Sequence, residues 1–266
     1  MNKLPTPEIT SDNYQNVYDY YASEKMHKIV PYIADLMTAS IFHPEVVVPE
    51  ETRDFITDSH RNRKPIILVA NHVQYQDHNV VSAAIHGVPL LRKMVVGNTL
   101  IFAKAPYFQE PKSRWYNELA NVVPVFREID IKHETGIDNP AMEVGRAASV
   151  LLDMTVKRIA KGQNLFLFPE GTRNRKDWEK VQSLEAGIGH IAFKAWHGAI
   201  DVNILPIGIA YHDQTPASIF KPVVYFGDPI LSRKDKPRIV TATVQSAIQD
   251  SVDQAYNVMK CRKHDE

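Results

Sequence analysis

Short apolar runs alternate with amphipathic segments along most of the chain. The runs that read as buried strands are Glu45–Val48, Ile66–Ala70, Met94–Val96, Val122–Phe126, Leu165–Phe168, Ile204–Ile209 and Val223–Phe226. The segments in which apolar residues recur at helical spacing are Asn79–His86, Lys112–Leu119, Ala141–Lys161, Ile188–Trp196 and Ile239–Met259. Strands that alternate with helices predict an α/β fold, with a mainly parallel central sheet flanked by helices on both faces.

The N-terminal segment has a different pattern. Asn13–Phe42 has helical spacing throughout, and Pro31 is expected to kink this helix. The apolar residues near one face are Val17, Tyr20, Tyr21, Ile29, Tyr32, Ile33 and Met37. Two interpretations stay open: the face packs on the core, or it lies on a bilayer surface. We therefore expect an N-terminal helical element over residues 1–44 and an α/β domain over residues 45–266, with the charged, aperiodic stretch Glu128–Pro140 as a long loop.

Composition narrows the classes of function. Lys+Arg 31 balances Asp+Glu 31, which argues against a nucleic-acid partner held by bulk charge. The single cysteine, Cys261, cannot form an intramolecular disulfide, which fits a reducing compartment. The polar stretch 1–13 has no secretory apolar region, and no apolar run approaches the roughly 18 residues of a spanning helix. We expect a chain that does not cross a membrane.

Several familiar functional motifs are absent from the chain or lack the sequence context that they require. Gly187–Ala192 has the outline of a dinucleotide fingerprint, but the stretch 176–185 before it is charged and is no strand. Small residues that let a helix pack closely explain it better. The chain has no Gly-x-Ser-x-Gly elbow and no Walker-type phosphate loop. His72, Asp77 and His78 lack the i, i+4 spacing typical of metal ligands on one element, so we predict no metal.

The stretch NHVQYQD, residues 71–77, directly follows a predicted strand. On a continuous helix of roughly 3.6 residues per turn, His72 and Asp77 would point about 140° apart. They can meet only if His72 lies in the strand-to-helix turn and Asp77 lies near the helix start. A carboxylate that accepts the imidazole N–H fixes the tautomer and makes the other ring nitrogen a better base. The alternative interpretation is a capping pair without chemistry.

A second polar turn follows another predicted strand. In LFLFPEGTR, residues 165–173, an apolar run leads into Pro-Glu-Gly-Thr-Arg. Active sites of open α/β sheets gather at the carboxyl ends of strands. Gly171 allows the backbone to approach a ligand closely, and Arg173 can bind an anionic oxygen.

These two stretches together resemble the glycerolipid acyltransferases, which include the 1-acylglycerol-3-phosphate acyltransferases. NHVQYQD is similar to the family motif N-H-x-x-x-x-D, and FPEGTRN is similar to F-P-E-G-T-R-S. The order and the separation of the pair make the resemblance specific. VVPVFR (122–127), ILPIGI (204–209) and FGDPI (226–230) resemble further blocks of the family. The resemblance covers residues 65–230.

The resemblance implies transfer of a fatty acyl group from acyl-CoA or acyl-carrier protein to a lipid hydroxyl. His72 would be the general base and Asp77 its orienting partner. The acceptor's polar head would be held by Arg127, Glu170, Gly171, Thr172 and Arg173. An apolar channel would take the acyl chain. No cofactor is implied beyond the donor substrate, and the expected partners are the lipid acceptor, the donor and a membrane surface. The expected location is the cytoplasm, peripheral to the inner face of the membrane.

Two positions depart from the family pattern for a phosphate-bearing acceptor. A lysine is expected just after the third strand, where the predicted strand is followed by Gly97-Asn98-Thr99, and Lys104 is a candidate replacement. Phe-Lys-x-Gly is expected after the Glu-Gly-Thr-Arg block, where this chain has Leu184-Glu-Ala-Gly187. The first expected acceptor is 1-acylglycerol-3-phosphate. A glycolipid or another polar lipid without phosphate is the alternative, and a non-catalytic lipid-binding protein is the alternative from a different class.

Overall fold

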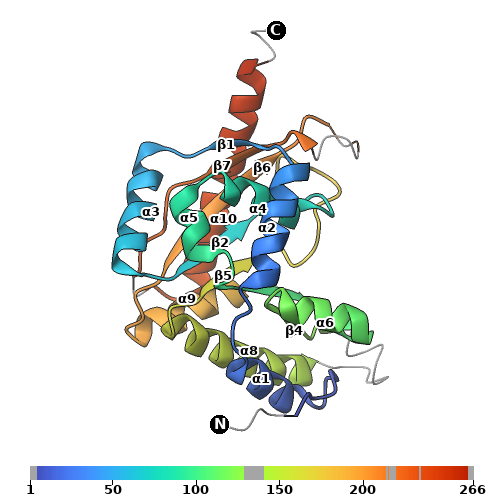
Figure 1. Ribbon diagram of the computed structural model, residues 1–266. Helices are drawn as coiled ribbons and strands as arrows, with labels where there is room; N and C mark the ends of the chain where they lie inside the picture. The colour runs from blue at the N-terminus through green and yellow to red at the C-terminus, as the bar shows by residue number, and fades with distance from the viewer. Residues whose placement is uncertain (1–4, 129–140, 214, 216–219, 234, 263–266) are drawn as a thin grey trace.

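A central sheet of seven strands organises the chain. The computed structural model describes residues 5–128, 141–213, 215, 220–233 and 235–262. The strands are β1 (Glu45–Val47), β2 (Ile66–Ala70), β3 (Thr99–Lys104), β4 (Val122–Val125), β5 (Asn164–Leu167), β6 (Asn203–Ala210) and β7 (Val223–Phe226). Their order across the sheet is β1-β7-β6-β2-β5-β3-β4. Figure 1 shows β1, β7, β6, β2 and β5 in succession. The predicted long loop Glu128–Pro140 lies, beyond its first residue, outside the described part of the chain.

The pairing is parallel from β6 through β2, β5 and β3 to β4. It is antiparallel between β6 and β7, and β1 then pairs with β7 in parallel. Parallel strands are buried on both faces and read as continuous apolar runs. The run Ile66–Ala70 is buried at every position, and so is Asn203–Ala210. The predicted fold, a mainly parallel α/β sheet flanked by helices, is confirmed.

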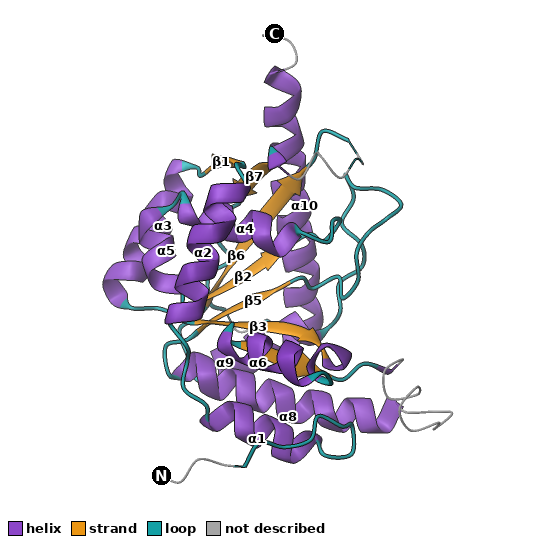
Figure 2. Ribbon diagram, turned by 45° about the vertical axis from the view of Figure 1, so that its right-hand side comes forward, coloured by secondary structure: helices purple, strands orange, loops and turns teal. Residues whose placement is uncertain are grey.

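Helices cover both faces of the sheet. One face carries α1 (Tyr14–Ser23), α8 (Ala141–Ala160), α9 (Gly187–His197) and α10 (Pro237–Arg262). The other carries α3 (Glu50–Asn62), α4 (Asp77–His86) and α5 (Pro89–Val95). Alternate residues of β2 serve the two layers: Ile67 and Val69 face the first, and Ile66 and Leu68 face the second. Figure 2 shows the two layers on either side of the strands. A 3-10 turn, η1 (Ala105–Phe108), and α6 (Pro111–Leu119) join β3 to β4.

One predicted strand is wrong. Met94–Val96 lies at the end of α5, which begins at Pro89, and the third strand is β3 (Thr99–Lys104). Pro89 is the first helical residue, where the absence of an N–H costs nothing. Leu91 and Val95, four residues apart, are both buried. Val95 in the last turn of this short helix and Val96 just after it are β-branched and resemble a strand in the sequence.

The small residues after residue 186 have the packing role expected of them. A Cβ on Gly189 would lie 2.2 Å from the carbonyl oxygen of Pro237 at the start of α10. Such a contact has no room for any side chain, so Gly189 lets α9 lie directly against α10. The stretch is a helix that packs closely.

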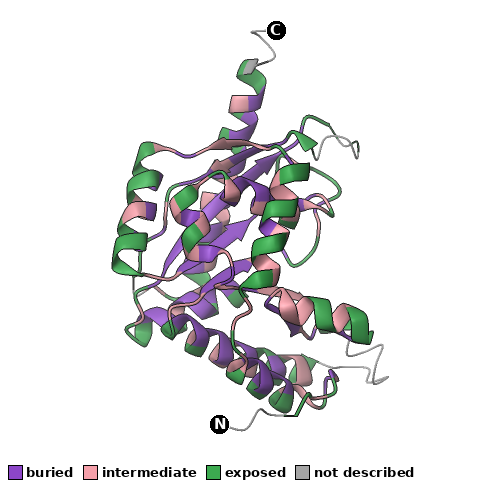
Figure 3. Ribbon diagram, viewed as in Figure 1, coloured by how far each residue is buried: buried purple, intermediate pink, exposed green. Residues whose placement is uncertain are grey.

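The N-terminal segment is two helices, so the prediction of one helix kinked at Pro31 is wrong. Helix α1 ends at Ser23, and α2 (Ile29–Ile41) begins after an extended connection. Pro31 lies in the first turn of α2, where its missing N–H would have had no partner within the helix. Figure 3 shows the buried face of α1 and the exposed surface of α2. Across the described residues, no helix combines the length and the apolar character needed to span a membrane.

Candidate active site

The predicted site residues follow strands that end at one edge of the sheet. Strands β6, β2 and β5 are neighbours in parallel, with Ala70 opposite Ile207 and Val69 opposite Leu167. Their carboxyl ends therefore meet, and the turn with His72 follows β2 while the Pro-Glu-Gly-Thr-Arg turn follows β5. Next along the same edge, β3 ends at Lys104 and β4 leads into Arg127, which is half-buried.

His72 and Asp77 meet as predicted. His72 lies in the turn after β2, and Asp77 is the first residue of α4. Nδ1 of His72 lies 2.8 Å from Oδ2 of Asp77, and the side chains are 21% and 0% exposed. A buried carboxylate at this distance holds the imidazole proton on Nδ1. In the neutral imidazole this tautomer leaves Nε2 as the nitrogen that can accept a proton.

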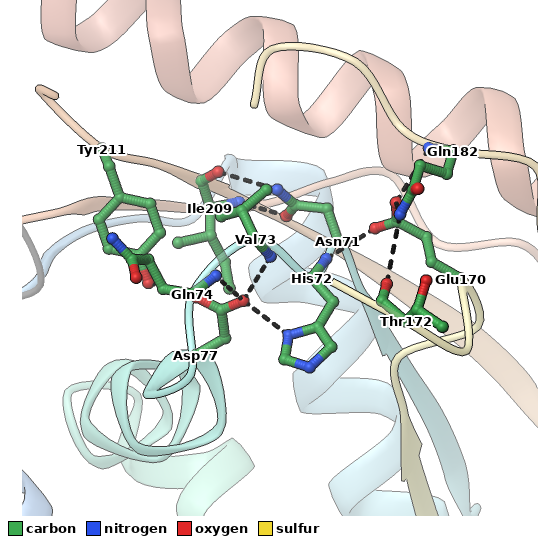
Figure 4. A network of polar contacts seen from close by, with 10 residues as sticks. All are labelled: Asn71, His72, Val73, Gln74, Asp77, Glu170, Thr172, Gln182, Ile209 and Tyr211. Atoms are coloured by element: carbon green, nitrogen blue, oxygen red, sulfur yellow. Dashed lines mark hydrogen bonds and ion pairs between the residues drawn. The ribbon is translucent and has the colours of Figure 1, made fainter. Parts of the chain in front are cut away.

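Asp77 is held by more than the histidine (Figure 4). Its Oδ2 also accepts the backbone N–H of Val73 at 2.7 Å and of Gln74 at 2.9 Å. Its other oxygen, Oδ1, accepts the hydroxyl of Tyr211, the first residue after β6. The carboxylate also lies at a helix N-terminus, which favours negative charge. The contacts together fix both the position and the orientation of this carboxylate.

The second motif holds the backbone of His72 on both sides. The N–H of His72 donates to Oε1 of Glu170 at 2.7 Å. The carbonyl oxygen of His72 accepts the N–H of Asn174 at 2.7 Å. The two motifs, far apart in sequence, therefore position the same residue, which is a physical reason for their occurring together.

Glu170 is buried within the framework of the site. Its Oε2 accepts the backbone N–H of Gln182 at 2.9 Å and the side-chain amide of Gln182 at 3.1 Å. Burial raises the pKa of Glu170, and the hydrogen bonds from His72 and Gln182 act in the opposite direction. Both oxygens of Glu170 accept hydrogen bonds from groups of the protein. The resemblance implies that Glu170 binds the acceptor, but this geometry favours a structural role in which Glu170 holds the loop.

The rest of the turn lies at the surface of the protein. Gly171 has φ +69°, a conformation that glycine adopts without strain, and both Gly171 and Thr172 are exposed. The guanidinium of Arg173 lies over the ring of Tyr75, 5.5 Å from its centroid. Tyr75 belongs to the His72–Asp77 turn and is exposed. Arg173 and Tyr75 thus bring the two turns together at the surface.

The corrected third strand changes the interpretation of one departure from the family pattern. Gly97-Asn98-Thr99 comes at the start of β3, whereas Lys104 is the last residue of β3. A lysine therefore stands at the end of the third strand, beside the strand that leads to Arg127. The second departure remains: Glu185 lies against the turn, and a Cβ on Gly171 would be 3.1 Å from its Cγ.

Sequence reasoning assigns no role to three residues that support this network. Asn71 joins β2 to β6, because its amide donates to the carbonyl oxygen of Ile209 and accepts the N–H of the same residue. Gln182 holds Glu170, and Tyr211 holds Asp77. The position of Tyr211 directly after a buried strand indicates a residue at the sheet edge. That its partner is Asp77 becomes known only with the strand order.

The arrangement can carry out proton transfer. The ring of Phe168 stacks on the imidazole of His72, with centroids 4.2 Å apart, so His72 has an apolar neighbour on one side. Nε2 is the ring nitrogen left for a substrate hydroxyl, as a general base requires. Among the residues that the structure describes, no group of three or more His, Cys, Asp or Glu side chains could hold a metal ion.

Comparison with known proteins gives one finding. The family model described as Acyltransferase matches residues 48–210, more than half of the chain, and this range includes both motif turns. No curated protein matches the chain.

Proposed function

The chain belongs to the acyltransferase family, and we propose that it transfers a fatty acyl group from acyl-CoA or acyl-carrier protein to 1-acylglycerol-3-phosphate. The observation that carries the proposal is the His72–Asp77 pair at the sheet edge, with Nε2 available to a hydroxyl. We place the acyltransferase domain at residues 45–266 and the N-terminal helical element at residues 1–44.

The proposed reaction needs one base. Nε2 of His72 takes the proton of the acceptor hydroxyl as its oxygen attacks the thioester carbonyl carbon. The new C–O bond forms, the C–S bond breaks, and the thiolate leaves with the proton that His72 carried. Asp77 stabilises the imidazolium that exists between these steps. The protein ends the cycle in its starting protonation state.

The phosphate of the acceptor is assigned to cations at the same edge. Lys104 is the last residue of β3, and Arg127 and the turn with Arg173 follow the neighbouring strands β4 and β5. Arginine and lysine at such a position supply charge-assisted hydrogen bonds to phosphate oxygens. The apolar channel for the acyl chain stays a prediction.

A second acceptor class is supported by Glu185. Its side chain lies against Gly171, so a carboxylate stands beside the turn assigned to the polar head. A negative charge there disfavours a phosphate and favours a hydroxyl-rich head such as that of a glycolipid. The two acceptors therefore need a direct comparison.

The lipid is expected to be reached from the surface of a membrane, and we propose that α2 lies on its inner face. Six large apolar side chains of this helix are exposed: Ile29, Tyr32, Ile33, Leu36, Met37 and Ile41. Lys25 and Lys28, just before the helix, are exposed and suit anionic head groups. Helix α2 packs on α4, which begins with Asp77, so the proposed membrane contact lies close to the site.

The test is an acyl-transfer assay with purified protein. Radiolabelled acyl-CoA and acyl-carrier protein are each offered with lysophospholipids and glycolipids, and the mass of the product identifies the acceptor. His72→Ala should lower turnover by roughly 10² to 10⁴, the range for losing a general base. The control is His190→Ala, which removes an exposed histidine from α9. Near-normal transfer by His72→Ala would refute the mechanism. Absence of product with every pair would favour a lipid-binding protein.

The acceptor assignment is tested in the same assay. Arg127→Ala and Arg173→Ala each remove a charge-assisted hydrogen bond, worth about 1.5–3 kcal/mol. A phosphate acceptor should lose more than a neutral one. Equal small losses for both acceptors would remove the proposed role in head-group binding.

A further inference from the structure

Asp77 is a fully buried carboxylate whose hydrogen bonds come from two sources. Oδ2 accepts the imidazole of His72 and the backbone N–H groups of Val73 and Gln74, all from its own turn. Oδ1 accepts the hydroxyl of Tyr211, which follows β6. Tyr211 therefore ties the base and its partner to a different strand of the sheet.

Tyr211 is a buried residue whose hydroxyl binds Asp77. Its side chain is buried, and the ring of Trp178 packs edge-on against it with centroids 5.7 Å apart. Burial raises the pKa of Tyr211 well above its ordinary value, and the neighbouring Asp77 raises it further. The phenol accordingly keeps its proton and stays a donor at neutral pH.

A hydrogen bond on Oδ1 matters because Asp77 is fully buried. An ionised carboxylate buried without a donor on one oxygen loses its solvation there. It can then rotate, or accept a proton, and in either case the orientation of the imidazole is no longer fixed. The three donors on Oδ2 would move with the turn, whereas Tyr211 is anchored by its position after β6.

We propose that Tyr211, through its hydroxyl on Oδ1 of Asp77, is a positioning residue that keeps His72 aligned as the base. The inference rests on the proposed function, because it assigns Tyr211 to the same reaction. Among the described residues, His78 of α4 also interacts electrostatically with His72 and Asp77, and Glu170 of the turn after β5 interacts with His72.

The test is Tyr211→Phe, which removes the hydroxyl and keeps the ring. The expected result is a fall in kcat of roughly 10- to 100-fold, the rate equivalent of one hydrogen bond to a charged group. KM for donor and acceptor should stay unchanged. The control is Tyr21→Phe, since Tyr21 is also buried and its hydroxyl donates to a carboxylate, Oε1 of Glu118, at 3.3 Å. That variant should keep its activity.

The pH profile separates positioning from a general loss of structure. Without the hydrogen bond from the phenol, the negative charge on Asp77 is less dispersed, and the carboxylate holds an imidazolium on His72 more strongly. The acid limb of the kcat profile should therefore move to higher pH in Tyr211→Phe. An unmoved limb together with a lowered kcat would overturn the inference.

A double variant separates failure of this inference from failure of the proposed function. In a His72→Ala background, Tyr211→Phe should have no further effect, because there is no base left to align. An equal loss in both backgrounds would overturn the positioning role. Full activity of His72→Ala would instead overturn the proposed function.

If Tyr211→Phe does not fold, Tyr211→His is compared with Tyr211→Leu. Higher activity of Tyr211→His, whose side chain can donate a hydrogen bond, would support the inference. Equal activity of the two variants would refute it.

Discussion

Helices α1 and α2 are neighbours in the chain with the same apolar spacing, yet they meet the rest of the protein in opposite ways. In α1 the apolar face is buried: Val17 is 0% exposed and Tyr18 is 1% exposed, against α8 and Phe126. In α2 the apolar face points outward, with Ile29 75% and Met37 58% exposed. An apolar stripe is therefore evidence of a partner, and in α2 no described part of the chain covers it.

The inner face of α2 carries polar contacts to its neighbours. Asp35 is buried and joins two neighbouring helices, with its Oδ2 2.8 Å from Nε of Arg92 on α5 and 3.0 Å from Nδ1 of His86 on α4. The hydroxyl of Thr38 donates to that of Ser82 at 3.0 Å. The buried residues of α1 are thus apolar, whereas the buried residue of α2 is an aspartate held by charge and hydrogen bonds. This difference leaves the apolar side chains of α2 exposed, as the proposed membrane contact requires.

The largest effect is expected from a core substitution in α1. Tyr18→Ala removes a buried ring and leaves a cavity, which should lower the free energy of unfolding by about 3–5 kcal/mol. The matched change in α2, Tyr32→Ala, removes a half-exposed ring whose contact with Arg92 is worth less than about 1 kcal/mol. Urea unfolding of the two variants measures both. Similar losses would mean that α2 packs as α1 does.

A smaller effect is expected from the polar attachment of α2. Asp35→Ala leaves Arg92 and His86 without their shared carboxylate, and the free energy of unfolding should fall by about 1–3 kcal/mol. Hydrogen exchange should rise in α2 and stay unchanged in α1. The control is Asp19→Ala, an exposed aspartate of α1, which should change stability by less than about 0.5 kcal/mol. Unchanged exchange in α2 would show that Asp35 does not hold this helix.

Most of the sheet can be predicted from the sequence, because buried parallel strands consist largely of consecutive apolar residues. Ile66–Ala70 and Asn203–Ala210 are fully buried and are recognisable for that reason. Strand β3 escapes prediction because Thr99–Lys104 is half-buried at all but one position. Helix α3 is not predicted either, because its buried residues are Thr52, Ile56 and Ser59. Ile56 is the one large apolar side chain among these three, so the buried face has no detectable apolar period.

The site is predictable where its contacts are local. His72 and Asp77 lie within one turn, so spacing alone requires a strand-to-helix turn for them to meet. The link from Tyr211 to Asp77 depends on β6 lying beside β2, a pairing that apolar patterns do not encode. The framework role of Glu170 likewise depends on Gln182, which reaches it from further along the same loop. Long-range polar contacts require the topology first.

The smallest effect on stability is expected from the outer face of α2, and it decides whether that face serves a membrane. Deleting residues 1–42 cannot decide it, because the deletion also removes the core face of α1. Ile33→Ser with Met37→Ser leaves α1 intact and changes side chains that are 50% and 58% exposed, so the free energy of unfolding should change by no more than about 0.5 kcal/mol for each.

The same double variant should bind anionic vesicles at least about tenfold more weakly, since each large apolar side chain gains about 1.5–3 kcal/mol on full burial. The control is Ile239→Ser, which removes an equally exposed apolar side chain from α10. Sedimentation with vesicles measures binding, and urea unfolding measures stability on the same samples.

A variant that stays folded and binds vesicles as wild type does would show that α2 is not the membrane contact. A variant that unfolds would show that its face has a partner within the protein. Weak binding with full stability is the result that sets α2 apart from α1, because it means that one apolar pattern serves the core in the first helix and a lipid surface in the second.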